Sequence, residues 1–227
     1  MRDIKTNVVW KHLETSKKKI IIEQGGSRSG KTYNILMWIV FGYCLRNKNK
    51  IVSICRKTFP ALRTSALRDF LEILKNHELY KEEDHNKTSS EYKLNGNLIE
   101  FISLDSPTKV RGRKRDLLFI NEANELFWED WNQLIFRTVG RVILDYNPSD
   151  EFHWIYDKVK TRDDADFFKT TYKNNKFLEE SIVKEIERLQ YTDENYWRIY
   201  GLGEIGQSKS TIFSFREIET IPENAKF

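Results

Sequence analysis

Cysteine, histidine and long apolar runs are all scarce in this sequence, and each scarcity excludes a class of protein. The 227 residues contain two cysteines and four histidines. Cys44 and Cys55 cannot build a disulfide framework, and both lie in apolar segments, which favours a reducing, intracellular compartment. The histidines have no metal-ligand spacing with each other or with the cysteines. No run of about 18 apolar residues is present, so the sequence predicts no membrane span and no membrane partner.

A strong charge of one sign is also absent. The chain has 38 Lys and Arg against 34 Asp and Glu, which gives a net charge of +4 and a pI near 8.8. This mildly basic balance permits a nucleic-acid partner without requiring one. The length suits one large α/β domain with or without a short tail.

Short β-rich runs alternate with helical patterns along the chain. Apolar runs predict strands at residues 19–24, 51–55, 117–121, 141–146 and 167–172. Helical periodicity appears at residues 32–45, 60–74, 128–139, 152–159, 178–189 and 193–200. Asn95-Gly96 separates two further β-rich runs and predicts a hairpin. The pattern predicts an α/β fold, with a mostly parallel sheet and helices on both faces.

Residues 25–32, GGSRSGKT, match the phosphate-loop pattern G-x-x-x-x-G-K-[ST] between a predicted strand and a predicted helix. Glycines allow backbone N–H groups to surround phosphate oxygens, and the helix N-terminus adds a positive dipole. Lys31 is expected at the β- and γ-phosphates, and the Thr32 hydroxyl is expected on Mg²⁺. The sequence therefore predicts a P-loop NTPase with phosphate contacts from Gly25, Gly26, Ser27, Arg28, Ser29, Gly30, Lys31 and Thr32.

A second motif follows a buried strand at residues 116–123, DLLFINEA, and has the form of a Walker B segment. Its polar end falls at the carboxyl edge, where open α/β sheets bind ligands. Glu122 takes the position of the general base that activates water for hydrolysis. Asn121 replaces the usual Asp as a Mg²⁺ ligand, keeping an oxygen but losing the charge. Asp145, at the end of another apolar strand, is a candidate for the missing carboxylate.

These segments, together with LDYNP, HWIYD, TTYKNNKFLEE and YGLGE, resemble in order the large terminase subunits of tailed bacteriophages, over about residues 20–213. The resemblance implies an additional-strand, conserved-glutamate (ASCE) P-loop ATPase in residues 1–205, with ATP and Mg²⁺ as cofactors. It implies that Arg28 acts in catalysis and that Glu122 is the base. It also implies that the strand end with Asp145 and Asn147 is the coupling motif, which senses the γ-phosphate and moves the parts that grip DNA.

The resemblance further implies translocation of double-stranded DNA into a procapsid. The expected partners are this DNA, the small terminase subunit and the portal of the procapsid. A ring of copies is expected in the assembled motor and a monomer in isolation, in the cytoplasm of an infected bacterium and not in the mature virion. Relatives carry a C-terminal nuclease, so residues 206–227 are expected to be a linker, and no nuclease activity is expected from this chain.

Five basic residues lie just before the Walker B strand: Lys109, Arg111, Arg113, Lys114 and Arg115. They are consistent with contact to a DNA backbone, or with a solvated loop. The resemblance adds a third interpretation, in which Arg111 is an arginine finger for a neighbouring subunit.

Two alternative functions share the same motifs. A helicase or recombinase-like ATPase would also need the phosphate loop and Glu122, and strand-unwinding activity would favour it. A nucleotide-binding module with little turnover is compatible with Asn121, and binding without hydrolysis would favour it.

Overall fold

The computed structural model describes residues 4–105 and 114–207. Its centre is an eight-stranded sheet in the order β3-β4-β5-β2-β6-β7-β1-β8. The five pairings from β5 to β8 are parallel, whereas β3–β4 and β4–β5 are antiparallel, so the mostly parallel sheet is confirmed. The strands are β1 (Ile20–Gly25), β2 (Ile51–Arg56), β3 (His85–Asn86), β4 (Glu91–Leu94), β5 (Asn97–Ser103), β6 (Arg115–Asn121), β7 (Thr138–Tyr146) and β8 (Ala165–Thr170).

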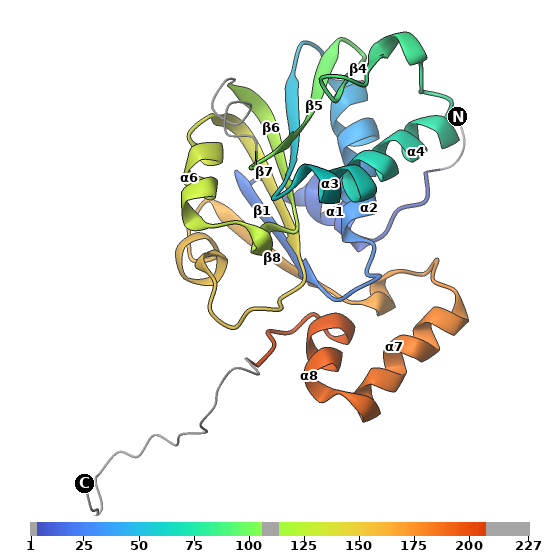
Figure 1. Ribbon diagram of the computed structural model, residues 1–227, viewed down its shortest axis with the longest axis vertical. Helices are drawn as coiled ribbons and strands as arrows, with labels where there is room; N and C mark the ends of the chain where they lie inside the picture. The colour runs from blue at the N-terminus through green and yellow to red at the C-terminus, as the bar shows by residue number, and fades with distance from the viewer. Residues whose placement is uncertain (1–3, 106–113, 208–227) are drawn as a thin grey trace, which may run out of the picture.

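Helices cover both faces of the sheet (Figure 1). On one face lie α1 (Val8–Thr15), α2 (Lys31–Met37), α3 (Phe59–Leu62) and α4 (Arg68–Asn76), and they enclose the larger apolar core. α6 (Trp128–Ile135) covers the other face over a second core. α2 continues as η1 (Trp38–Tyr43) and η2 (Cys44–Arg46), and η3 (Arg63–Leu67) joins α3 to α4.

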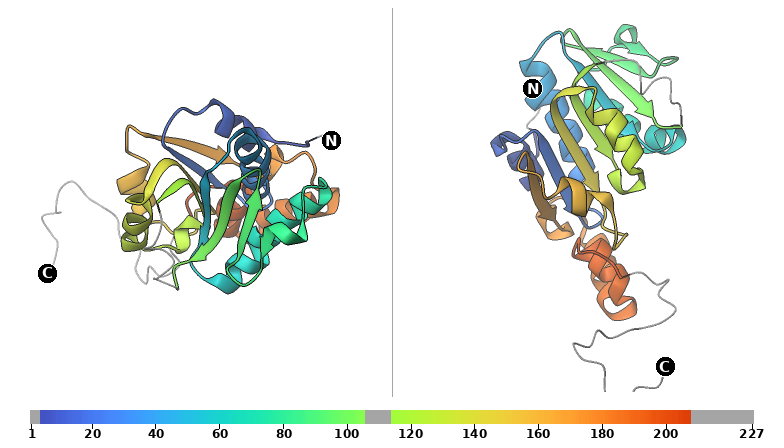
Figure 2. Two further views of the ribbon diagram at one scale, coloured as in Figure 1. Left: turned by 90° about the horizontal axis from the view of Figure 1, so that it is seen from above. Right: turned by 90° about the vertical axis from the view of Figure 1, so that its left-hand side faces the viewer.

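The last described helices form a separate group at one end of the sheet, as Figure 1 and the right-hand view of Figure 2 show. They are α7 (Glu180–Thr192), α8 (Glu194–Tyr196) and η8 (Trp197–Gly201). The remaining short elements are η4 (Glu82–Asp84), η5 (Ala123–Glu125), η6 (Ile155–Val159) and η7 (Tyr172–Asn174). No helix among the described residues has the length and apolarity that a membrane crossing needs.

The strand order brings the sequence motifs to one edge. β7 lies between β1 and β6, and all three run parallel, so their carboxyl ends meet. In this register Asn121 is opposite Asp145, and Gln24 is opposite Tyr146. The phosphate loop follows β1 at this edge, where open α/β sheets bind ligands.

The boundary of one predicted helix and the interpretation of one basic residue need correction. The helix predicted at residues 128–139 ends at Ile135, and β7 already begins at Thr138. Thr138 and Val139 are β-branched, and Thr138 pairs with Arg115 in the ladder to β6. Arg115 does not belong to a solvated basic loop, because it begins β6, is fully buried and interacts electrostatically with Glu100. The short helix α1 was missed by the sequence analysis.

Residues 206–227 were expected to form a linker. Gly206 and Gln207 are described, and the Gly206 N–H donates a 3.1 Å hydrogen bond to the Pro148 carbonyl. Residues 208–227 lie outside the described part of the chain, and so does Arg111. The division into an ATPase domain and a linker therefore stays a prediction.

Candidate active site

The phosphate loop connects β1 to α2 through a backbone that needs left-handed conformations. Gly30 caps α2 with φ of 81°, and Arg28 has φ of 60°. Glycine adopts such angles without strain, whereas a non-glycine residue there costs about 1–3 kcal/mol. Residues 27–32 line a cavity of about 440 Å³ next to the first turn of α2. Backbone N–H groups in that turn have no partner within the helix, so they are available to an anion.

Lys31 lines this cavity and is 7% exposed. Its Nζ donates hydrogen bonds to the carbonyls of Gly25 and Gly26, both at 3.0 Å, and to Asn147 Oδ1 at 3.0 Å. Burial lowers the pKa of Lys31, and the nearby carboxylates of Asp145 and Glu122 oppose that shift. The site therefore holds a buried ammonium group that links the phosphate loop to the end of β7.

Asp145, the residue before the last one of β7, is a buried carboxylate, 1% exposed. One oxygen accepts a hydrogen bond from the Thr32 hydroxyl. The other accepts from Asn121 Nδ2 at 2.9 Å and from the Glu122 backbone N–H at 3.0 Å. Burial raises the pKa of Asp145, and the hydrogen bonds from Thr32 and Asn121 oppose this. Asp145 therefore lies beside Thr32. It provides a carboxylate near Asn121, which replaces the usual Walker B aspartate.

Oxygen ligands for Mg²⁺ are present at this point. Magnesium is held in nucleotide sites by one or two carboxylates together with phosphate oxygens, and the Asp145 and Thr32 oxygens fit this description. Asn121 directs its amide nitrogen to Asp145, while its Oδ1 accepts from Ser65 at 3.3 Å. Across residues 4–105 and 114–207, no group of three or more His, Cys, Asp or Glu is arranged to hold a metal by itself.

Glu122 follows β6 in a left-handed conformation, with φ of 52°. Its backbone N–H is held by Asp145, and its side chain lines the same cavity as Lys31. Burial, followed by repulsion from Asp145, raises the pKa of Glu122 to about 7. A carboxylate with this pKa can gain and lose a proton near neutral pH, which suits a general base.

Arg56, at the end of β2, is a cation that the sequence analysis missed. Its guanidinium donates to Glu125 at 2.7 Å and to Ser65 at 3.1 Å. Ser65 in turn donates to Asn121, and the Arg56 charge lowers the pKa of Glu122, opposing the effect of burial. Its position at the carboxyl end of a buried parallel strand was a signal available in the sequence.

Two asparagines from distant parts of the chain hold the phosphate loop. Asn7 Nδ2 donates to the Ser29 carbonyl, and Asn175 Nδ2 donates to the Arg28 carbonyl, both at 2.9 Å. Asn7 also caps α1 by accepting from the Val9 N–H. A polar residue before an apolar helical run could have revealed this cap.

The tail after α8 packs directly on the loop. The Ser27 N–H donates to the Tyr200 carbonyl at 2.8 Å. Gly203 has φ of 64°, and a Cβ there would lie 2.7 Å from the Gly26 nitrogen and 2.8 Å from Gly25 Cα. Only glycine fits this close approach, which explains one glycine of the YGLGE segment.

The structure brings together the site residues predicted within its described part. Residues 27–32, Glu122 and Asn147 line the cavity, with Arg28 exposed at its rim. Gly25 and Gly26 contact Lys31, and Asp145 and Asn121 contact Thr32. The catalytic, metal-binding and coupling roles assigned to these residues stay predictions.

A phosphate loop, a glutamate after the strand that Walker B occupies, and an additional strand between β1 and β6 define a P-loop NTPase fold of the ASCE class. The profile described as phage terminase large subunit matches residues 17–204. The chain belongs to the phage terminase large subunit family.

Individual relatives agree with this assignment. The chain is 26% identical over 210 residues to the PBSX phage terminase large subunit of Bacillus subtilis (strain 168), covering 80% of this chain and 48% of that protein. The large terminase of a thermophilic bacteriophage has a similar fold, with a TM-score of 0.73 at 20% identity over 88% of this chain and 53% of that one.

The Thermus phage P74-26 large terminase ATPase domain has a TM-score of 0.62 at 15% identity, over 88% of this chain and 94% of that domain. The chain therefore spans about half the length of the curated relative and nearly the whole of an isolated ATPase domain.

Proposed function

We propose that this chain is the ATPase part of a DNA-packaging motor, which hydrolyses ATP to drive double-stranded DNA into a procapsid. Family membership supports the motor role, and the placement of Glu122 and Lys31 around one cavity supports hydrolysis. The thermophilic bacteriophage terminase of the same fold has been solved in complex with ADP and in complex with ATP-gamma-S.

In the proposed reaction, Glu122 accepts a proton from water as the water oxygen bonds to the γ-phosphorus. The bond between that phosphorus and the β–γ bridging oxygen breaks, and ADP leaves. Lys31 and Arg28 offset the negative charge that develops on the phosphoryl oxygens. Phosphate oxygens compete with the Gly25 and Gly26 carbonyls and with Asn147 for the Lys31 ammonium. Asn147 can therefore respond to the occupant of the site.

Mg²⁺ fits the oxygens of Thr32 and Asp145 and supplies charge neutralisation to the phosphates when bound. Asn121 orients Asp145 through its amide nitrogen. The carboxylate of Asp145 thus takes the part that an aspartate usually plays at the position of Asn121.

The proposed partners are double-stranded DNA, the small terminase subunit, the portal and neighbouring copies of the chain in a ring. The proposed place of action is the cytoplasm of an infected bacterium. We assign the ATPase to residues 1–205 and a linker to residues 206–227. Arg111 is proposed as the arginine finger in the ring.

The observation that carries the proposal is geometric: the Glu122 carboxylate and the Lys31 ammonium line one cavity beside the phosphate loop. Burial and Asp145, which raise the pKa of Glu122, support the role of base. Phosphate release from ATP should be measured with and without double-stranded DNA, beside Lys31→Ala. Turnover that DNA stimulates and that Lys31→Ala abolishes is expected. ATP binding without turnover, even at high protein concentration, would instead favour the nucleotide-binding module. Strand unwinding would favour a helicase.

A further inference from the structure

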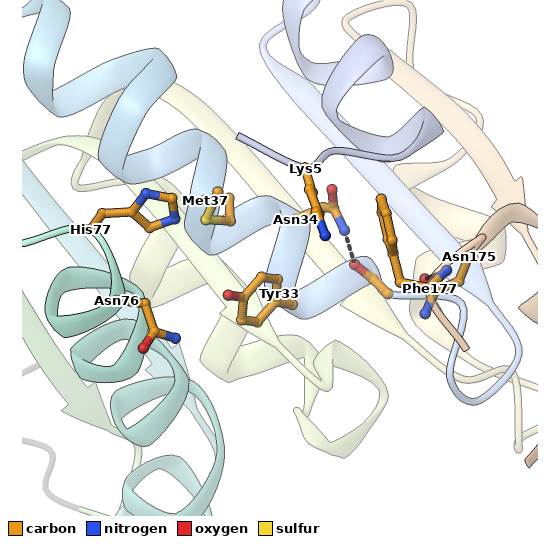
Figure 3. Close-up of a pocket in the computed structure, with 9 residues that line it drawn as sticks. Lys5, Tyr33, Asn34, Met37, Asn76, His77, Asn175 and Phe177 are labelled. Atoms are coloured by element: carbon orange, nitrogen blue, oxygen red, sulfur yellow. Dashed lines mark hydrogen bonds between the residues drawn. The ribbon is translucent and has the colours of Figure 1, made fainter. Parts of the chain in front are cut away.

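A second cavity, of about 630 Å³, opens beside the phosphate loop (Figure 3). Small-molecule pockets commonly fall within about 300–1,000 Å³, so this one has room for a substantial ligand. Gly30, Tyr33 and Asn175 line both this cavity and the phosphate cavity. The two spaces are therefore neighbours, and one ligand can extend from one into the other.

Two aromatic side chains that line this cavity are exposed. Tyr33, in the first turn of α2, is 36% exposed, and Phe177, after β8, is 55% exposed. In the view of Figure 3 they lie on the two sides of the Lys5 and Asn34 side chains. Flat aromatic faces of this kind bind nucleobases by stacking. Met37, one turn further along α2, adds an apolar surface to the same wall.

Phe177 is held in a fixed relation to the phosphate loop. Asn175 donates through Nδ2 to the Arg28 carbonyl at 2.9 Å, and its Oδ1 accepts from the Phe177 N–H at 3.2 Å. One side chain therefore connects the loop that would hold phosphates to the ring that would hold a base. Lys5 Nζ lies 5.8 Å from the centre of the Phe177 ring and adds positive charge on the same side.

The Asn34 side chain is already used within the fold. Its Nδ2 donates to the Gly30 carbonyl and its Oδ1 accepts from the Asn7 N–H, both at 2.9 Å. Its amide therefore already has partners on both sides. The aromatic rings of Tyr33 and Phe177 are therefore the side chains that we consider for recognition of the ligand.

We propose that this cavity is the nucleoside site, in which a purine base stacks on Tyr33 and Phe177 while its phosphates extend past Gly30 into the loop. The inference rests on the proposed function, because it names the residues that hold the base of the nucleotide. It also gives the segment after β8 a direct contact with the nucleotide.

The test compares ADP with tripolyphosphate, which carries phosphates without a base, as ligands of the full chain in titration calorimetry. Tyr33→Ala and Phe177→Ala are each expected to weaken ADP binding about tenfold, the order of effect of removing one stacking ring. Tripolyphosphate affinity is expected to stay unchanged. Tyr33→Phe keeps the ring and should bind ADP like the wild type. Phe127→Ala removes another exposed ring, 65% exposed and distant in sequence, and should have no effect.

The outcomes separate this inference from the proposed function. Unchanged ADP affinity in both alanine variants, with normal wild-type binding, would overturn the nucleoside site and leave the ATPase proposal intact. An equal loss of affinity for ADP and for tripolyphosphate would also overturn the nucleoside site, since the substitutions would then act through the phosphate loop. A wild-type chain that binds neither ligand would overturn both.

Discussion

The side-chain nitrogen of Asn121 donates a 2.9 Å hydrogen bond to Oδ1 of Asp145, its neighbour across the parallel pair β6–β7. The carboxylate expected at the end of the Walker B strand thus stands one strand away. It lies beside Thr32, which donates to its other oxygen. An amide and a carboxylate are compatible neighbours, whereas two carboxylates at this separation would each oppose ionisation of the other.

Exchanging these two side chains tests their relationship. Asn121→Asp should lower the free energy of unfolding at pH 8 in EDTA by about 1–3 kcal/mol, because it replaces a buried hydrogen bond with repulsion. Adding Asp145→Asn to that variant should recover part of the loss, since one amide again faces one carboxylate. Denaturant unfolding of the wild type, the two single variants and the double variant gives the coupling free energy between the two side chains. Strictly additive effects on the free energy of unfolding would contradict the relationship.

Glu122→Gln should reduce kcat for ATP hydrolysis by about 10²–10⁴-fold, because the amide cannot accept the proton from water. ADP affinity should remain within a few-fold of the wild type, since the amide has nearly the same shape. Glu129→Gln, on the exposed surface of α6, is the matched control and should hydrolyse ATP normally. Normal turnover in Glu122→Gln would remove Glu122 from the role of base.

The rate of hydrolysis should rise with pH. Burial and Asp145 raise the pKa of Glu122 to about 7, and a base acts only after it has lost its proton. We expect kcat/KM, which reports the free enzyme, to increase from pH 5.5, to be half-maximal near pH 7 and to level off above about pH 8. The profile belongs to the interacting Glu122–Asp145 pair. A rate that falls over this range would exclude a carboxylate base.

The free energy of unfolding should fall as pH rises, whereas the rate of hydrolysis should rise. The Glu122 carboxyl keeps its proton to about pH 7 in the folded chain, but loses it near its ordinary pKa of 4.5 when unfolded. The folded state therefore binds more protons between these values, and its stability falls as pH rises. Glu122→Gln lacks this penalty, so it should gain stability relative to wild type between pH 5 and pH 8. Urea unfolding without nucleotide measures the difference, and a constant offset would contradict the shift.

Gly203→Ala should weaken ADP binding at least tenfold. The new Cβ would lie within 3 Å of the Gly26 nitrogen and Gly25 Cα, so the phosphate loop must move. Gly96→Ala is the matched control, because Gly96 also has positive φ, at 78°, but a Cβ there meets nothing closer than 3.8 Å. Both variants should lose about 1–2 kcal/mol of stability through backbone strain. Equal ADP affinity in the two would show that contact with the loop is unimportant.

The parallel sheet and the phosphate loop could be predicted from the sequence because both produce patterns among residues that are close together in the chain. β1 and α2 flank GGSRSGKT as expected, and the Asn95-Gly96 hairpin joins β4 to β5. The contacts between strands are not local. That Asp145 lies opposite Asn121 follows from β7 inserting between β1 and β6, an order that apolar runs alone do not specify.

Other features escaped the sequence analysis for similar reasons. Asn7 and Asn175 are 168 positions apart, and only the folded chain shows that both hold the phosphate loop. The helix predicted at residues 128–139 was too long, because the helical spacing of aromatic and apolar residues continued into the strand that follows. In that case, ladder pairing with β6 determined the boundary at Thr138.

The Tyr200 carbonyl accepts its hydrogen bond from Ser27, inside the loop that would surround a nucleotide. Any force applied to the chain beyond Gly203 is therefore transmitted to the phosphate loop within a few bonds. Linkage is reciprocal: if nucleotide binding changes the free energy of moving this tail, moving the tail changes nucleotide affinity by the same factor. The load on the tail and the occupancy of the loop would then be coupled through a single equilibrium.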